Sequence, residues 1–170
     1  RHGRARPLCY IRPMSVDSLC VTSWRARPVS FVSLMTLYES NYIRLRALLG
    51  DARELRGAAI SRTTGDLDLH LQAIEHCRYT TILRMTYLFG DADGPVAEPD
   101  LEVRVYHDAR LAEACHSAAR TRHPGLSGLR AALPAGLGER WLRNMLLNKW
   151  RDYCAERGHR FALTAAPGTA

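Results

Sequence analysis

The chain has 170 residues, 46% of them hydrophobic, which suits one domain with a real core. Its net charge of +7 would suggest a nucleic-acid-binding protein if it were spread over the chain. Residues 1–29 hold six arginines and one acid, however, which leaves 18 basic and 16 acidic residues elsewhere. We therefore expect no nucleic-acid contact except through residues 1–29.

Cysteine usage and hydropathy indicate the compartment. The five cysteines are odd in number, widely scattered and never in a Cys-x-x-Cys pair, which argues against a disulfide framework or a zinc knuckle. No apolar run approaches the roughly 20 residues that span a bilayer. We expect a cytoplasmic protein without membrane association.

Residues 1–29 contain Pro7, Pro13 and Pro28 and show no sustained period of 2 or 3.6. We predict a disordered basic extension. The alternative is a basic arm that grips RNA, DNA or anionic lipid. The arginines are not interleaved with aromatic residues, which disfavours that alternative.

A single α+β domain is predicted over residues 30–163, and it begins with a helix at 30–49. Ser30 can cap the start and Gly50 can close the end. The apolar residues recur at spacings of three and four, which is typical of a helix with one buried face. They are Phe31, Leu34, Tyr38, Tyr42, Leu45 and Leu49.

Three strands are predicted next, because apolar and polar residues alternate over 66–73, 78–89 and 100–106. The segment 90–99 is rich in Gly, Pro and acids and is predicted to be a loop. Short reversals between successive strands imply an antiparallel meander with one apolar and one polar face.

At His107-Asp108 the period changes from 2 to helical spacing, so a second helix is predicted from Asp108 to about residue 122. A last helix is predicted at 137–157, with Gly158 as its stop. The predicted fold is therefore α+β, a three-stranded antiparallel meander with about three helices on one face. Residues 164–170 are predicted to form a frayed tail.

Four segments together carry a family resemblance. They begin at Leu34 (Leu-Met-Thr-Leu-Tyr-Glu-Ser-Asn-Tyr-Ile-Arg-Leu), Arg78 (Arg-Tyr-Thr-Thr), Val103 (Val-Arg-Val-Tyr-His-Asp-Ala-Arg-Leu-Ala-Glu) and Trp150 (Trp-Arg-Asp-Tyr-Cys). They resemble the YqiB-like family of small cytoplasmic proteobacterial proteins. The resemblance implies a bacterial cytoplasmic protein with no established activity.

The densest polar chemistry lies where the predicted third strand meets the predicted helix. Arg104 and Tyr106, with Arg78 and Thr80 on the adjoining strand, are candidates for binding an anion or a partner, since arginine clamps phosphate and carboxylate oxygens. His107, which titrates near pH ~6.5 when unperturbed, and Asp108 are the candidate catalytic residues.

Simpler interpretations exist for the same residues. Asp108 can be a helix cap, and His107 falls in register with Val103 and Val105 at the edge of the core. Arg104 can form ordinary cross-strand ion pairs on an exposed face.

Metal and cofactor sites are not expected. None of the possible ligands shows spacing such as His-x-x-x-His or Cys-x-x-Cys, and there is no Gly-rich phosphate loop. Those ligands are His70, His76, Cys77, His107, Cys115 and His116.

The sequence favours a non-enzymatic accessory or binding protein that recognises a partner or a small anion. One alternative is a hydrolase or transferase acting on a phosphorylated or nucleotide substrate, with His107 moving a proton and Arg78 and Arg104 holding the anion. A second alternative is nucleic-acid association through residues 1–29.

Overall fold

The computed structural model describes residues 30–91, 94–117 and 136–161. The predicted basic extension at 1–29 and the predicted tail at 164–170 lie outside these ranges. The helices are α2 (Phe31–Leu49) and α4 (Leu137–Glu156), with one 3₁₀ turn at Ala52–Glu54. The strands are β1 (Ala58–Ser61), β2 (Leu69–His76), β3 (Thr80–Asp91), β4 (Gly94–Tyr106) and β5 (Leu111–Ser117).

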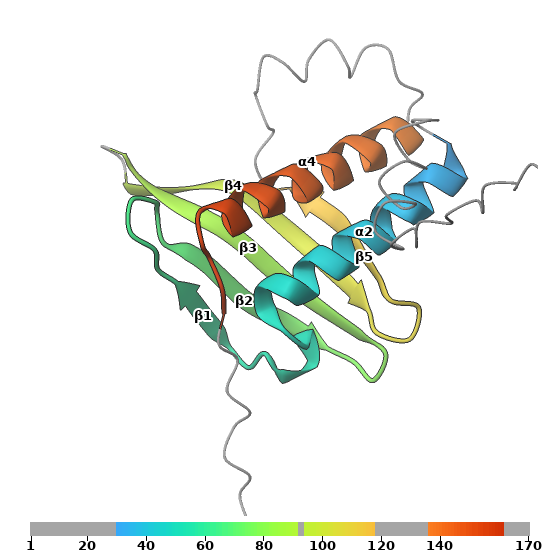
Figure 1. Ribbon diagram of the computed structural model, residues 1–170, viewed down its shortest axis with the longest axis horizontal. Helices are drawn as coiled ribbons and strands as arrows, with labels where there is room; N and C mark the ends of the chain where they lie inside the picture. Colours follow the sequence, from blue (N-terminus) through green and yellow to red (C-terminus); the bar gives the residue numbers. More distant parts are fainter. Residues whose placement is uncertain (1–29, 92–93, 118–135, 162–170) are drawn as a thin grey trace, which may run out of the picture.

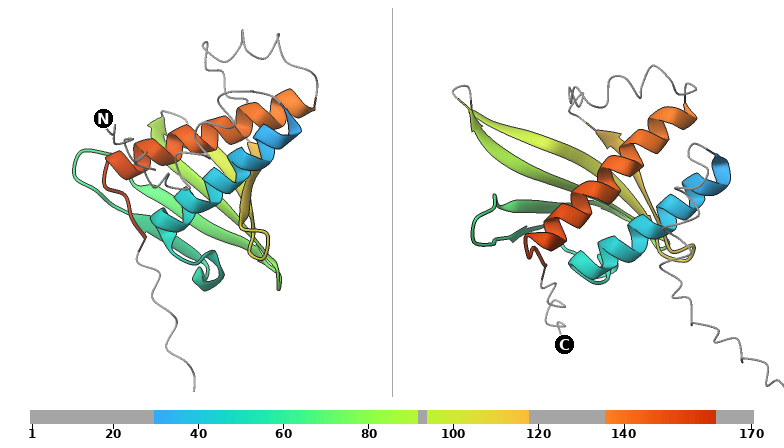
Figure 2. Two further views of the ribbon diagram at one scale, coloured as in Figure 1. Left: turned by 45° about the vertical axis from the view of Figure 1, so that its right-hand side comes forward. Right: turned by 45° about the horizontal axis from the view of Figure 1, so that its top comes forward.

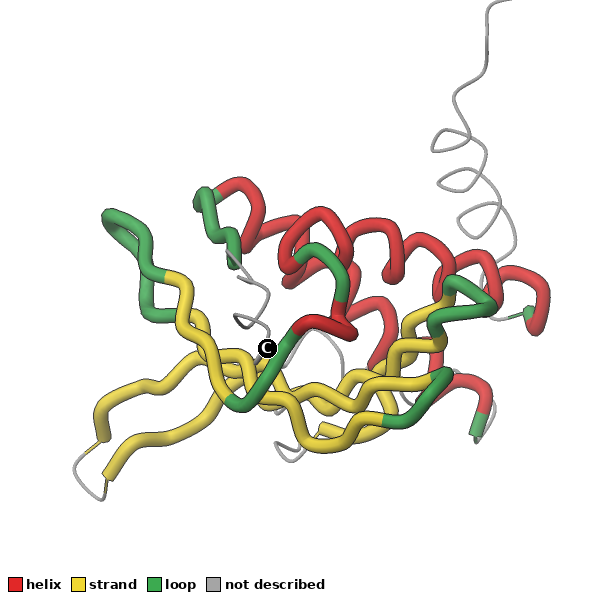
Figure 3. The backbone as a smooth tube through the Cα atoms, turned by 90° about the horizontal axis from the view of Figure 1, so that it is seen from below, coloured by secondary structure: helices red, strands yellow, loops and turns green. Residues whose placement is uncertain are grey.

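The described residues form two layers. The strands make one antiparallel sheet in the order β1-β2-β3-β4-β5, and α2 and α4 both lie on one side of it (Figure 1; Figure 3). We call the covered side the helix face and the other side the open face. The predicted α+β class is confirmed. The predicted three strands and three helices are inexact, because the described residues contain five strands and two α-helices.

The prediction of a helix that begins at Asp108 is wrong over the described residues 108–117. Residues 107–110 form a turn, with Arg110 at a left-handed φ of 54°, and the chain then returns as β5 beside β4. Alanines favour helix in isolation, but Ala112 and Ala114 are fully buried on the helix face, opposite Val105 and Val103. Burial of these small residues under the helices overrides their local preference.

The loop predicted at 90–99 is also wrong, because β3 and β4 continue as a ribbon in which Asp91 faces Gly94. Pro95 and Pro99 resemble loop residues. They are compatible with β4 here because β5 pairs with β4 only from Leu101 onward, so their missing N–H groups interrupt no ladder on that side.

Two further strands differ from the predictions in their bounds, and one strand was not predicted. The strands predicted at 66–73 and 78–89 occupy 69–76 and 80–91. Strand β1 was not predicted, because Ala-Ala-Ile-Ser is too short to show alternation.

The first and last helices agree with their predictions. Ser30 accepts a hydrogen bond from the backbone of Ser33 at 3.1 Å, and Gly50 ends α2 at a φ of 78°. Both helices pack on the apolar rows of the helix face. Those rows consist of Leu69, Leu71, Leu83, Met85, Tyr87, Leu101, Val103, Val105, Ala112 and Ala114, all buried.

The two helices run in the same direction across the sheet (Figure 2). Their side chains meet along a buried polar seam. Asn41 of α2 donates to Oδ1 of Asn144 at 3.2 Å and accepts from Asn148 at 3.0 Å. At the far end of the seam Arg44 pairs with Asp152 at 2.8 Å. Buried amides must be paired to avoid a desolvation cost, so this seam selects one register of α2 against α4.

Asn144 also ties the helices to the sheet. Its Oδ1 accepts the backbone N–H of Ala114 at 2.8 Å, and Arg143 donates to the Ala114 carbonyl at 3.4 Å. At Ala114 the outer edge of β5 is thus satisfied by side chains of α4 instead of another strand.

Replacing Asn144 with alanine would leave the buried Ala114 N–H without its acceptor, and the Asn41 amide would keep only the backbone carbonyl of residue 144 at 3.4 Å. We expect a loss of about 2–5 kcal/mol in the free energy of unfolding, measured by urea denaturation. Lys149→Ala on the exposed side of α4 is the control and should change stability by no more than about 0.5 kcal/mol. A loss below about 1 kcal/mol for Asn144→Ala would contradict this account.

Candidate functional site

The predicted site residues do not converge. Arg104, Tyr106 and Thr80 lie on the open face, where Thr80 and Tyr106 are opposite one another on β3 and β4. His107 lies on the helix face. Three of the six lie in turns. His107 and Asp108 belong to the turn after β4, where Asp108 accepts from the Ala109 N–H at 2.8 Å, and the guanidinium of Arg78 is 5.1 Å from the centre of the Tyr79 ring.

Arg104 is embedded in a network on the open face. A hydrogen bond with Tyr106, followed by nearby negative groups that include Glu113, raises the pKa of the Arg104 guanidinium. Tyr106 in turn donates to one Glu113 oxygen at 3.3 Å, and Tyr38 donates to the other at 2.9 Å. Arg104 is therefore linked through Tyr106 to the Glu113 carboxylate.

Arg84, the second arginine of the open face, forms an ion pair with a carboxylate. Arg84 donates from Nε to one oxygen of Asp100 at 2.6 Å and from Nη2 to the other, a two-pronged pair. Asp100 is buried, whereas the Arg84 side chain is 42% exposed.

His107 belongs to a relay on the helix face. Its Nε2 lies 2.9 Å from Thr81 Oγ1, which lies 3.2 Å from His76 Nδ1, and His76 Nε2 donates to the Leu55 carbonyl at 2.7 Å. That carbonyl can only accept, so neutral histidines are satisfied when each group donates to the next, from His107 to Leu55. The relay links the turn after β4, strand β3 and strand β2 to Leu55 in the segment after α2.

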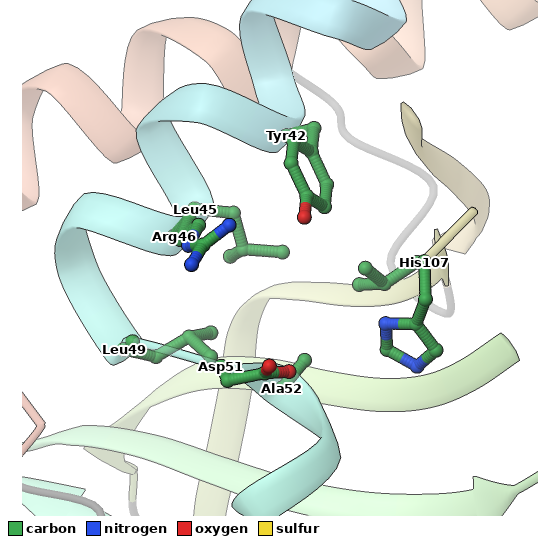
Figure 4. Close-up of a pocket in the computed structure, with 9 residues that line it drawn as sticks. Tyr42, Leu45, Arg46, Leu49, Asp51, Ala52 and His107 are labelled. Atoms are coloured by element: carbon green, nitrogen blue, oxygen red, sulfur yellow. The ribbon is translucent and has the colours of Figure 1, made fainter. Parts of the chain in front are cut away.

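The space beside His107 is too small for a substrate. A cavity of about 10 Å³ lies between the end of α2 and the end of β4, room for about one water molecule (Figure 4). Tyr42 and Arg46 come to it from α2, Asp51 from the following turn and His107 from the sheet. His107 is thus a partly buried histidine at the edge of the core, as its register indicated.

Burial, followed by the nearby Arg53, lowers the pKa of His107. We expect its imidazole to titrate below pH about 6.5 in an NMR titration, and Arg53→Ala to move that pKa upward. Because the folded value is the lower one, this histidine should reduce stability as the pH falls from about 6.5. Arg62→Ala is the control and should leave the titration unchanged. An unperturbed or raised pKa would contradict the placement of His107.

A second polar cluster was missed by sequence reasoning. His159 Nδ1 lies 3.1 Å from Ser61 Oγ, and Nε2 donates to Asp66 Oδ2 at 3.1 Å. Tyr87 and Tyr153 donate to Asp66 at 3.1 and 3.2 Å. Ser61 and His159 are 98 positions apart, and no local spacing indicates that they meet.

This serine, histidine and aspartate are the residue types of a catalytic triad, but the cluster is enclosed. The His159 side chain is fully buried, and Ser61 is 4% exposed. Ser61 Oγ also accepts the Arg160 backbone N–H at 3.1 Å, and the Phe161 N–H donates to the Leu48 carbonyl at 2.9 Å. The cluster holds the segment after α4 against the helix face, and a substrate has no access to it.

Asp66 is the electrostatic centre of that cluster. Burial opposes its ionisation, but hydrogen bonds from the Leu67 backbone, His159 and the two tyrosines outweigh burial and lower the pKa of Asp66. A depressed carboxyl pKa stabilises the fold above the unfolded value of about 3.9, and this contribution is lost as the pH falls through the folded value.

Asp66→Asn should therefore cost about 1–3 kcal/mol at pH 7, and its difference from the parent should shrink as the pH falls below about 4. Chemical denaturation at several pH values measures this. Asp68→Asn breaks only the exposed pair with Arg62 and should cost no more than about 1 kcal/mol at pH 7. A deficit for Asp66→Asn that is independent of pH would argue against a charged Asp66.

The open face carries a shallow concavity of about 330 Å³ that extends over β1, β2, β3 and Ala97 of β4. Its lining mixes apolar side chains with hydrogen-bonding groups, which is typical of a recognition surface. The lining residues are Ala58, Ala59, Ile60, His70, Leu71, Gln72, Arg84, Thr86, Leu88 and Ala97.

Within residues 30–91, 94–117 and 136–161, no three His, Cys, Asp or Glu side chains gather as metal ligands would. In the same ranges, no helix combines the length and apolar character needed to cross a bilayer.

Comparison with known proteins extends over most of the chain. A family described as a protein of unknown function, DUF1249, matches residues 44–160. The uncharacterized protein YqiB of Escherichia coli K12 is 29% identical over 128 residues, which cover 75% of this chain and 90% of YqiB, and YqiB of the O157:H7 strain matches equally. No solved structure matches. The YqiB-like resemblance is thereby confirmed, and the chain belongs to the DUF1249 family.

Proposed function

We propose that this protein is a non-enzymatic binding protein that recognises a partner protein on the open face of its sheet. The observation that supports this most directly is the 330 Å³ concavity, which is accessible and lined by both apolar and hydrogen-bonding side chains. Exposed apolar side chains border it: Ile60 is 43% exposed and Leu88 is 40% exposed. Thr80, Arg104 and Tyr106 form the polar part of the same face.

The geometry gives an enzyme less support. General acid–base catalysis needs a titrating group within hydrogen-bond reach of a bound substrate. His107 faces a space for one water, and His159 is enclosed.

The charges of the open face favour a protein partner over a small anion. Arg84 is paired with Asp100, and Arg104 is linked through Tyr106 to Glu113. A small anion at Arg84 would have to displace Asp100, and one at Arg104 would meet the negative charge of the nearby Glu113, whereas a protein surface with both signs of charge can complement these groups.

Ala97→Trp should fill the concavity. Val96→Trp is the control, because it places the same ring at the preceding position of β4, outside the lining of the concavity. We expect proteins retained from an Escherichia coli lysate by the tagged parent chain to be kept by Val96→Trp and reduced at least about tenfold by Ala97→Trp. Circular dichroism checks that both variants fold.

Equal retention by the two variants would refute the open face as the recognition surface. The small-anion alternative has its own readout, a thermal-shift screen with nucleotides and phosphorylated metabolites. A stabilising shift that Arg104→Ala abolishes would replace the partner with an anion.

A further inference from the structure

Strand β1 presents a free edge whose polar groups can be identified from the register. The Ala73 N–H donates to the Gly57 carbonyl at 2.7 Å, and Ala59 and Ser61 are in the same phase of the antiparallel ladder. The N–H and C=O groups of Ala58 and Ile60 must then point away from β2. No strand among the described residues pairs with that side.

This edge strand, four residues long, contains no residue of the types that usually protect edge strands. Lysines, prolines and charged side chains commonly discourage pairing with another strand, but Ala58–Ser61 contains none of them. The side chains of Ala58 and Ile60 lie on the open face and line the concavity. An added strand would therefore extend the sheet and place its own side chains beside the concavity.

Arginines flank the uncharged edge. Arg56 precedes it, is exposed, and donates only to the carbonyls of Arg53 and Leu55, with no carboxylate partner among the described residues. Arg62 follows it and is 70% exposed, although it also pairs with Asp68. The exposed Arg160 is held at the same end, because its N–H donates to Ser61.

We propose that β1 binds the partner by strand addition, and that the partner contributes an extended segment with a small or apolar uncharged centre and acidic ends. Arg56 and Arg62 are six positions apart, which is at most about 20 Å of extended chain, so the matching acids should be separated by up to about six positions. Backbone hydrogen bonds to Ala58 and Ile60 supply affinity, and the flanking arginines supply selectivity. This inference rests on the proposed function, since it names the class of partner.

A second copy of the chain suits this edge less well. Antiparallel pairing of two β1 strands about a two-fold axis brings the arginine that precedes one strand toward the arginine that follows the other. Like charges placed opposite each other disfavour pairing.

A library of random ten-residue peptides displayed on phage and selected on the full chain tests the proposal. We expect enriched peptides with β-branched or small centres and acids up to about six positions apart. Each enriched peptide is then N-methylated one residue at a time. Strand addition predicts that methylation at alternate positions weakens binding about tenfold or more, while the intervening positions tolerate it.

Two substitutions locate the site. Ile60→Pro removes an N–H that points away from β2, so it should leave the β1–β2 ladder intact and weaken peptide binding about tenfold, whereas Ile60→Val should not. Arg62→Glu should reduce binding of acidic-ended peptides by a similar factor and leave the fold unchanged.

The proposal is overturned by no enrichment, by enriched peptides with basic ends, by N-methyl effects without alternation, or by binding insensitive to both Ile60→Pro and Arg62→Glu. A dimer in sedimentation that Ile60→Pro abolishes would assign the edge to a second copy and also overturn it. The peptide experiments could fail while Ala97→Trp still removes the retention of lysate proteins. That combination would reject strand addition and preserve the proposed function of the open face.

Discussion

The side chain of Asn144 joins both layers of the molecule. Its oxygen accepts from Ala114 on the outermost strand and from Asn41 on the neighbouring helix, and its amide donates to the Arg140 carbonyl of its own helix at 2.8 Å. Hydrophobic burial alone would allow two parallel helices to slide over an apolar sheet face. A buried amide with three geometric requirements permits one arrangement, which fixes β5, and through it the β4–β5 hairpin.

Residues that act locally were predictable from the sequence. The caps of α2, the apolar alternation of Leu69 and Leu71, and the inward direction of His107 all follow from nearest neighbours along the chain. Strand β5 was misassigned because its alanines obtain their strand conformation from the helices packed above them. Nothing within the segment itself encodes that cover.

The candidate site shows the same difference between features set by local sequence and features set by distant parts of the chain. Arg104 and Tyr106 could be placed on an exposed face from alternation, whereas their link to Glu113 depends on pairing between β4 and the misassigned β5. The Ser61–His159–Asp66 cluster joins distant parts of the chain, and only the tertiary fold brings them together. Interpretations of polar residues therefore depended on long-range partners more than interpretations of apolar ones did.

The attachment of His159 and Phe161 to the helix face has a consequence for biosynthesis. The Leu48 carbonyl, the Ser61 hydroxyl and the Asp66 carboxylate emerge from the ribosome roughly a hundred residues before the groups that satisfy them. During translation the earlier part of the chain must keep these acceptors hydrated, with its core incomplete. The native packing of this protein can therefore close only after the ribosome has delivered residue 161.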